Sequence, residues 1–145
     1  MTDEYRNILV AVDASPQAKQ AFAEAINIAK RNHGRMTLMT VIDTSSFRGT
    51  TGANSVALLD EVRQQAQELI RQLEAEVSIK ESQVPISSKV IAGSPKREIV
   101  SLASQINADL IVMGATGLGA ISQVLVGSTT AYVVNQASCN VMVIK

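Results

Sequence analysis

Short apolar runs alternate with longer amphipathic segments along this chain of 145 residues, and this alternation limits the possible folds more than any other feature. Apolar runs of four to eight residues are typical of strands buried on both faces of a parallel sheet. Strands that alternate with helices favour right-handed crossovers within one sheet. We therefore predict a single doubly wound α/β domain over residues 1–145, Rossmann-like, with four helices and a five-stranded parallel sheet of order 3-2-1-4-5. The predicted strands cover residues 7–13, 36–42, 84–91, 110–113 and 140–144.

The segments between these runs carry helix start and stop signals. Ser15 and Pro16 predict an N-cap followed by a first-turn proline, and Gly34 after His33 predicts a C-cap glycine. A third helix is expected after Gly93, and a fourth over about 128–137. The second and longest helix is indicated by an apolar stripe made of Val56, Leu59, Val62, Ala66, Leu69, Ile70 and Leu73. Because the strand at 84–91 contains proline and polar residues, we expect it near a sheet edge.

Composition excludes several classes of function. The 13 basic and 13 acidic side chains cancel, whereas proteins that bind nucleic acid usually carry a positive excess. Aromatic residues make up 3% of the chain and tryptophan is absent, so stacking platforms for single-stranded nucleic acid are not expected. The sequence has no apolar run of 18 residues and no signal-like start, so we expect no membrane association. The single cysteine, Cys139, favours a reducing, cytoplasmic compartment.

The predicted topology places a ligand site between the first and fourth strands, where the strand order reverses. Asp13 follows the first of these strands, and the fourth leads into a loop that contains Gly114 and Gly117. Glycine allows a backbone to approach a ligand closely. The loop ends at Gly127, before the helix that begins near Ser128, and the free amides of a helix start bind anions. Two simpler interpretations remain open, in which Ser128 only caps its helix and Asp13 only caps the first helix.

Common nucleotide-binding motifs do not account for this loop. The Walker pattern fails because Ala120 and Ile121 follow Gly119, where lysine and serine or threonine are required. The dinucleotide pattern GxGxxG fails because Ser122 stands at its last position, and because the loop follows the fourth strand rather than the first.

The spacing Gly114-x2-Gly117-x9-Gly127-Ser128, preceded by residues 109–113, resembles the nucleotide-binding signature of the universal stress protein family. The likeness covers the whole chain and implies an adenine nucleotide α-hydrolase-like fold. It also implies a cytoplasmic, stress-associated protein of the ATP-binding branch, which is usually a homodimer. Mg²⁺ would be held mainly by phosphate oxygens, without protein side chains as firm ligands. The resemblance also assigns residues to ATP, or to another adenine nucleotide. Adenine and ribose would be held by Asp13 and the Val41 backbone, with Ala11 and Val12 beneath them. The ribose and first phosphates would be lined by Met113, Gly114 and Gly117, and the phosphate tail would be bound by Gly127, Ser128 and Thr129.

Two departures from the family pattern affect this expectation. Residues 137–140 lack the proline that family members often have near the last strand, which bears on the strand connection. Residues 118–126 are more apolar than a phosphate loop rich in basic residues, so phosphate neutralisation is left to amides, hydroxyls and metal.

Catalysis finds little support in the residues themselves. The only histidine, His33, is expected at a helix end, and a triad cannot be built from one histidine and one cysteine. We therefore predict a nucleotide-dependent regulatory module. The alternatives are a slow ATPase, an enzyme that phosphorylates itself at Ser128 or Thr129, and a structural interaction domain that binds no nucleotide.

The last predicted strand bears on assembly. Residues 140–144 would form an exposed apolar edge in a monomer, which favours a twofold dimer through this strand. The alternative is that the chain's own segment around Tyr5 covers this edge.

Overall fold

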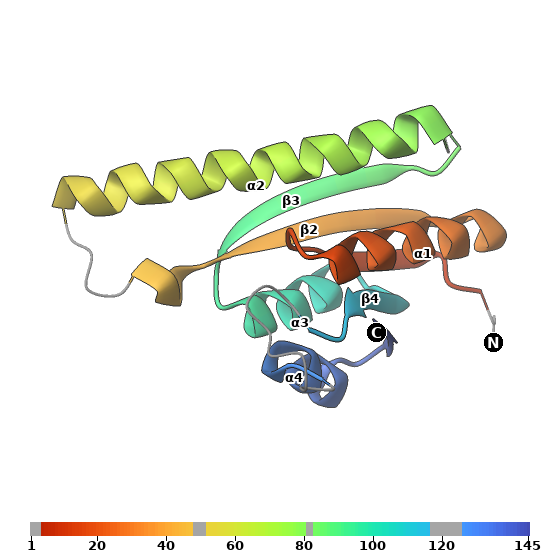
Figure 1. The fold of residues 1–145 in the computed structure, drawn as a ribbon. Coiled ribbons are helices and arrows are strands. Elements are labelled where there is room, and N and C mark those ends of the chain that lie inside the picture. Colours follow the sequence, from red (N-terminus) through yellow and green to blue (C-terminus); the bar gives the residue numbers. More distant parts are fainter. Residues whose placement is uncertain (1–3, 48–51, 81–82, 117–125) are drawn as a thin grey trace.

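The computed structural model describes residues 4–47, 52–80, 83–116 and 126–145, and these form one five-stranded parallel sheet (Figure 1). The strand order is β3-β2-β1-β4-β5, which confirms the predicted order and the edge position of the third strand. The strands are β1 (Asn7–Ala11), β2 (Arg35–Asp43), β3 (Ile86–Gly93), β4 (Leu110–Gly114) and β5 (Asn140–Ile144). They are joined by α1 (Pro16–Asn32), a short 3-10 helix η1 (Thr44–Phe47), α2 (Gly52–Lys80), α3 (Pro95–Gln105) and α4 (Ser128–Gln136).

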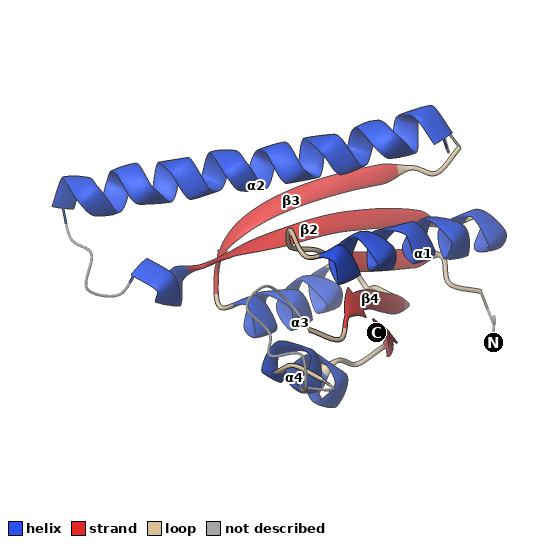
Figure 2. Ribbon diagram, viewed as in Figure 1, coloured by secondary structure: helices blue, strands red, loops and turns tan. Residues whose placement is uncertain are grey.

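Helices cover both faces of the sheet, with α1 and α2 on one face and α3 and α4 on the other (Figure 2). Alternate side chains of β1 therefore enter different cores, because successive residues of a strand point to opposite faces. Ile8 and Val10 join Phe22 of α1 in one core, whereas Leu9 joins Leu102 of α3 in the other. Because both faces of β1 are buried, its sequence is a continuous apolar run.

The first helix begins as predicted and ends differently. The Ser15 side chain accepts a hydrogen bond of 3.2 Å from the amide of Ala18, so Ser15 is the N-cap. At the other end His33, with φ of 55°, adopts the left-handed C-cap conformation that we assigned to Gly34. Gly34 is needed for a different reason, because a Cβ there would lie 2.7 Å from the carbonyl oxygen of Tyr5. The glycine lets the N-terminal segment cross the helix end.

The apolar stripe of α2 is buried only toward its C-terminal end. Ile70 and Leu73 lie in the core, whereas Val56 is 70% exposed. Figure 1 shows the first turns of α2 extending past the end of β3, so these turns have little of the sheet beneath them. The prediction that Val56 belongs to the packed stripe is therefore wrong.

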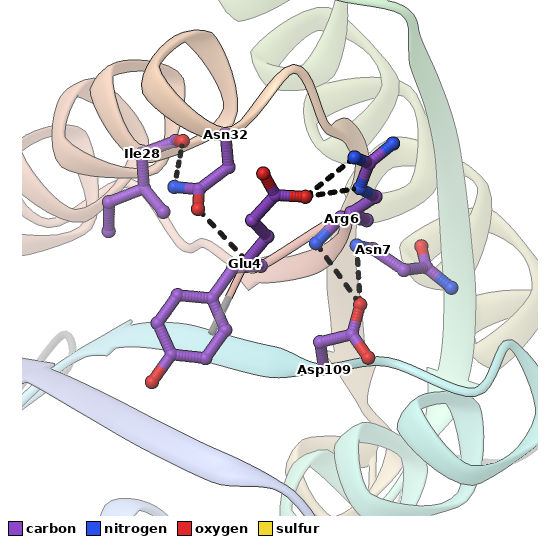
Figure 3. A network of polar contacts seen from close by, with 7 residues as sticks. Glu4, Arg6, Asn7, Ile28, Asn32 and Asp109 are labelled. Atoms are coloured by element: carbon purple, nitrogen blue, oxygen red, sulfur yellow. Dashed lines mark hydrogen bonds and ion pairs between the residues drawn. The ribbon is translucent and has the colours of Figure 1, made fainter. Parts of the chain in front are cut away.

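A polar network fixes the N-terminal segment at the amino end of the sheet (Figure 3). One carboxylate oxygen of Asp109 accepts hydrogen bonds of 3.1 and 2.9 Å from the amides of Arg6 and Asn7. The Asn32 side chain accepts a bond of 3.1 Å from the amide of Tyr5. Asp109 thus satisfies backbone donors where β1 and β4 begin, at the opposite end of the strands from the predicted site.

The outer strand β5 pairs, within the described residues, with β4 alone. Asn140 at its start donates a hydrogen bond of 2.9 Å to the Tyr5 hydroxyl, and residues 141–144 are half-buried. Cys139, just before the strand, is also half-buried, and this burial raises the pKa of its thiol. Within the described residues, the hydrogen bond between Tyr5 and Asn140 joins the N-terminal segment to the first residue of β5.

Candidate functional site

A cavity of about 500 Å³ opens beyond the carboxyl ends of β1, β2 and β4, where the strand order reverses. This is the position at which open α/β sheets bind ligands. All predicted site residues within the described part of the chain line this cavity, and the remaining one, Gly117, lies outside the described residues. The lining consists of Ala11, Val12, Asp13, Ser15, Ala18, Met39, Val41, Asp43, Pro95, Ile99, Met113, Gly114, Thr116, Gly127, Ser128, Thr129 and Thr130.

One wall of the cavity is formed where β1 passes into α1. The strand ends at Ala11, and the amide of Val12 still donates a hydrogen bond of 2.9 Å to the carbonyl of Met39 on β2. A carboxylate oxygen of Asp13 accepts a bond of 2.9 Å from the amide of Ser15. Since Ser15 is the N-cap of α1, the simpler interpretation of Asp13 as that cap is wrong. The carboxylate instead stabilises the turn that carries it to the cavity.

The opposite wall is formed by the end of β4 and the start of α4. Gly127 donates a hydrogen bond of 2.7 Å from its amide to the carbonyl of Ala115, and Thr130 donates one of 2.8 Å from its hydroxyl to the carbonyl of Gly114. Gly127 is the N-cap of α4 and, having no side chain, makes no side-chain capping hydrogen bond. The interpretation of Ser128 as a side-chain cap is therefore wrong, because Ser128 is the first residue of the helix.

The start of α4 therefore presents backbone amides at the cavity. Uncapped amides and the positive end of the helix dipole attract anions, and a dipole contact contributes about 0.3–1 kcal/mol at an exposed site. The hydroxyls of Ser128 and Thr129 line the same place and add donors. This end of the cavity can bind phosphate without a basic side chain.

The two walls are joined by Gln17, a residue that sequence reasoning missed. Its side-chain oxygen accepts hydrogen bonds of 2.9 Å from the Thr116 amide and 2.6 Å from the Thr116 hydroxyl. A Cβ at Gly114 would lie 3.1 Å from the Gln17 Cβ, so glycine at this position lets α1 pack closely on the end of β4. A glutamine in a first helical turn carries no sequence signal for such a contact.

The floor of the cavity is apolar and aliphatic. It is formed by side chains from three strands and from two helices, and none of the described lining residues is aromatic. A flat heterocycle would therefore pack against aliphatic groups rather than stack on a ring. The apolar lining residues are Ala11, Val12, Ala18, Met39, Val41, Pro95, Ile99 and Met113.

The described residues lack both a metal-binding cluster and a membrane-spanning helix. They contain no group of three or more histidine, cysteine, aspartate or glutamate side chains placed to hold a metal ion. Among the same residues, no helix combines the length and apolarity needed to cross a membrane.

Comparisons with known proteins relate the whole chain to one family. Residues 4–145 match the model of the family described as "Universal stress protein family". A Staphylococcus aureus (strain USA300) protein that is named as a universal stress protein is 35% identical over 142 residues, which cover 97% of this chain and 84% of the relative.

Solved structures give the same result. Universal stress protein UspA from Lactobacillus plantarum is 38% identical, with a TM-score of 0.89, and the match covers 99% of this chain and 100% of that one. A universal stress protein solved in complex with cAMP is 22% identical, with a TM-score of 0.65 and 98% of both chains covered. At this identity the second likeness extends to the fold alone.

Proposed function

Since the chain belongs to the universal stress protein family, we propose that it is an ATP-binding regulatory domain that acts in a cytoplasmic stress response with little or no catalysis. The observation that carries this proposal is the cavity at the strand-order reversal. The cavity combines an aliphatic floor with a helix start whose N-cap is a glycine, as a ligand with an apolar ring and an anionic tail requires.

The adenosine part of the ligand would bind at the β1 and β2 side. Ala11, Val12 and Val41 offer aliphatic surface of a kind that adenine can pack on. Asp13 lies on the same wall, and a carboxylate can accept hydrogen bonds from ribose hydroxyls or from the adenine amino group. Its negative charge is unsuited to phosphate, so this side favours the nucleoside.

The phosphates would bind at the β4 and α4 side. Met113 and Gly114 lead to this side, where Ser128 and Thr129 present amides and hydroxyls. Gly127 lines the same side, with its own amide bonded to the Ala115 carbonyl. We also propose that Gly117 belongs to this group, as the family pattern implies. Mg²⁺ would bind mainly to phosphate oxygens, where it neutralises their charge and orients the phosphate chain.

The described residues that line the cavity include no histidine or cysteine to serve as a general base or nucleophile. Its two carboxylates, Asp13 and Asp43, each accept a hydrogen bond from the amide two residues further on. Neither His33 nor Cys139 lines the cavity. These features favour a role in binding over one in catalysis.

Millimolar Mg-ATP is expected to raise the melting temperature of the purified protein. Ligand at 100 times its Kd adds about 2.7 kcal/mol of stability, which corresponds to about 5–10 °C for a chain of this size. Purified protein that is denatured should also release adenine nucleotide, which chromatography of the supernatant would detect. An empty supernatant together with an unchanged melting temperature would show that the proposed function is wrong.

We further propose a homodimer formed through β5. This strand ends the sheet, its side chains at 141–144 are half-buried, and its pairing with β4 uses one of its two backbone edges. Twofold pairing of β5 with its copy would cover the other edge. Sedimentation analysis at micromolar protein should give about twice the chain mass, and a monomer at that concentration would contradict the dimer.

A further inference from the structure

A second hollow, of about 550 Å³, adjoins the cavity between the segment after β2 and the starts of α3 and α4. The two hollows share Asp43, Pro95, Ser128 and Thr129 in their linings. The start of α4, where the proposed phosphate site lies, therefore borders both of them. A ligand chain that continues past Ser128 and Thr129 can enter the outer hollow without leaving the protein surface.

The chemistry of the outer hollow differs from that of the inner cavity. Lys96 and Arg97, in the first turn of α3, contribute two positive charges to its lining. Among the described residues that line it, the one carboxylate is Asp43, which accepts hydrogen bonds from the amide and the hydroxyl of Ser45, at 3.0 and 2.7 Å. The remaining side chains are mainly hydroxyls. This lining favours an anionic, polar group over an apolar one.

The position of Lys96 links the outer hollow to the phosphate side of the inner cavity. Its ammonium nitrogen lies 5.2 Å from the ring centroid of Tyr132, a distance at which a cation and an aromatic ring attract each other. Tyr132 is one helical turn after Ser128 on α4, so the two residues share a face of that helix. The ring thus holds the positive charge close to the helix start that borders both hollows.

From these observations we propose that Lys96 and Arg97 bind the terminal phosphate of the nucleotide and thereby make the chain distinguish ATP from AMP. This inference rests on the proposed function, because it requires the nucleoside to occupy the inner cavity. A monophosphate reaches only the amides and hydroxyls at the start of α4. A triphosphate extends further and adds charge that the two basic side chains attract.

The double variant Lys96→Ala and Arg97→Ala tests this assignment by isothermal titration with Mg-ATP and with AMP. We expect its affinity for ATP to fall about tenfold, the effect of two exposed charge contacts, and its affinity for AMP to change by less than about twofold. The matched control is Arg35→Ala with Lys89→Ala, which removes the same charge from exposed positions outside both hollows. The control should bind both nucleotides as the wild type does.

The outcomes of this experiment distinguish a failure of the inference from a failure of the proposed function. If the double variant binds ATP as tightly as the wild type, or loses ATP and AMP affinity equally, the inference is wrong while the proposed function stands. If the wild type binds neither nucleotide, the proposed function itself fails. Lys96→Gln with Arg97→Gln, which keeps most of the side-chain volume, should reproduce the tenfold loss if charge is the cause. Unchanged ATP affinity in that variant would likewise overturn the assignment.

Discussion

Valine in place of Gly127 is expected to weaken ATP binding about 30-fold, which corresponds to about 2 kcal/mol. A Cβ at this position would lie 3.4 Å from the carbonyl oxygen of Ala115 and 3.7 Å from the Cα of Thr116, so one methyl group just fits. The two further methyl groups of valine meet backbone that cannot yield easily, because the Gly127 amide is bonded to that same Ala115 carbonyl. Overpacking of this kind costs about 1–3 kcal/mol, and we expect the first turn of α4 to shift away from the phosphates.

Gly127→Ala is the matched control for this prediction. Its Cβ makes ordinary contacts, and the φ of −72° at this position suits any residue. The alanine variant should bind ATP within about threefold of the wild type, as measured by isothermal titration, and both variants should keep the circular dichroism of a folded domain. A valine variant that is folded and binds ATP normally would argue against the helix start as the phosphate site, and would favour an interaction domain that does not use its cavity.

Removal of the Phe22 ring should cause the largest loss of stability among single substitutions in the core. Phe22 is 1% exposed and packs from α1 into the core that includes Ile8 and Leu110 of the central strands. Phe22→Ala leaves a cavity on the face where α1 covers the sheet, and such changes cost about 3–5 kcal/mol. Because small domains have only about 5–15 kcal/mol of unfolding free energy, this is a large share. Urea denaturation followed by circular dichroism measures it.

The only other phenylalanine offers a control with the same chemistry. Phe47 lies in η1 and is half-buried, so Phe47→Ala removes an identical ring from a site with less packing. We expect it to cost about 1 kcal/mol, close to the typical value for a single substitution. Equal losses from the two variants would contradict the assignment of Phe22 to the centre of the core.

The sheet could be predicted because burial on both faces leaves a direct mark in the sequence. The continuous apolar run of β1 and the proline beside β3 were sufficient to place one strand centrally and the other at the edge. Helix packing was less predictable. The apolar stripe of α2 identifies the helix face that packs on the sheet, but not how far the sheet extends beneath the helix. Val56 is exposed because it lies in the turns that extend past the sheet.

The end of α1 shows a second limit of sequence reasoning. Glycine near a helix end usually indicates a left-handed residue, yet Gly34 is explained by close contact with the Tyr5 backbone, and His33 adopts the left-handed conformation. A contact between segments 29 residues apart leaves no local signal.

The candidate site followed from topology and spacing to a large extent. The carboxyl ends of parallel strands share one edge, so Asp13 and Gly114 could be expected together before any contact was known. Val41 was assigned to the site only by the resemblance to the universal stress protein family. Lys96 and Arg97 were missed because a basic pair in an exposed first turn is common on any helix. Only the packing of α3 beside α4 brings that pair to the outer hollow that adjoins the cavity.

The link between Gln17 and Thr116 has a consequence for the energetics of binding. It ties the first turn of α1 to the segment after β4, so these two sides of the cavity are already held together before a ligand enters. A site whose walls are pre-organised loses little conformational entropy on binding. Breaking this link with Gln17→Ala would leave every direct ligand contact in place, and any loss of affinity would then measure how much binding depends on walls that are ordered in advance.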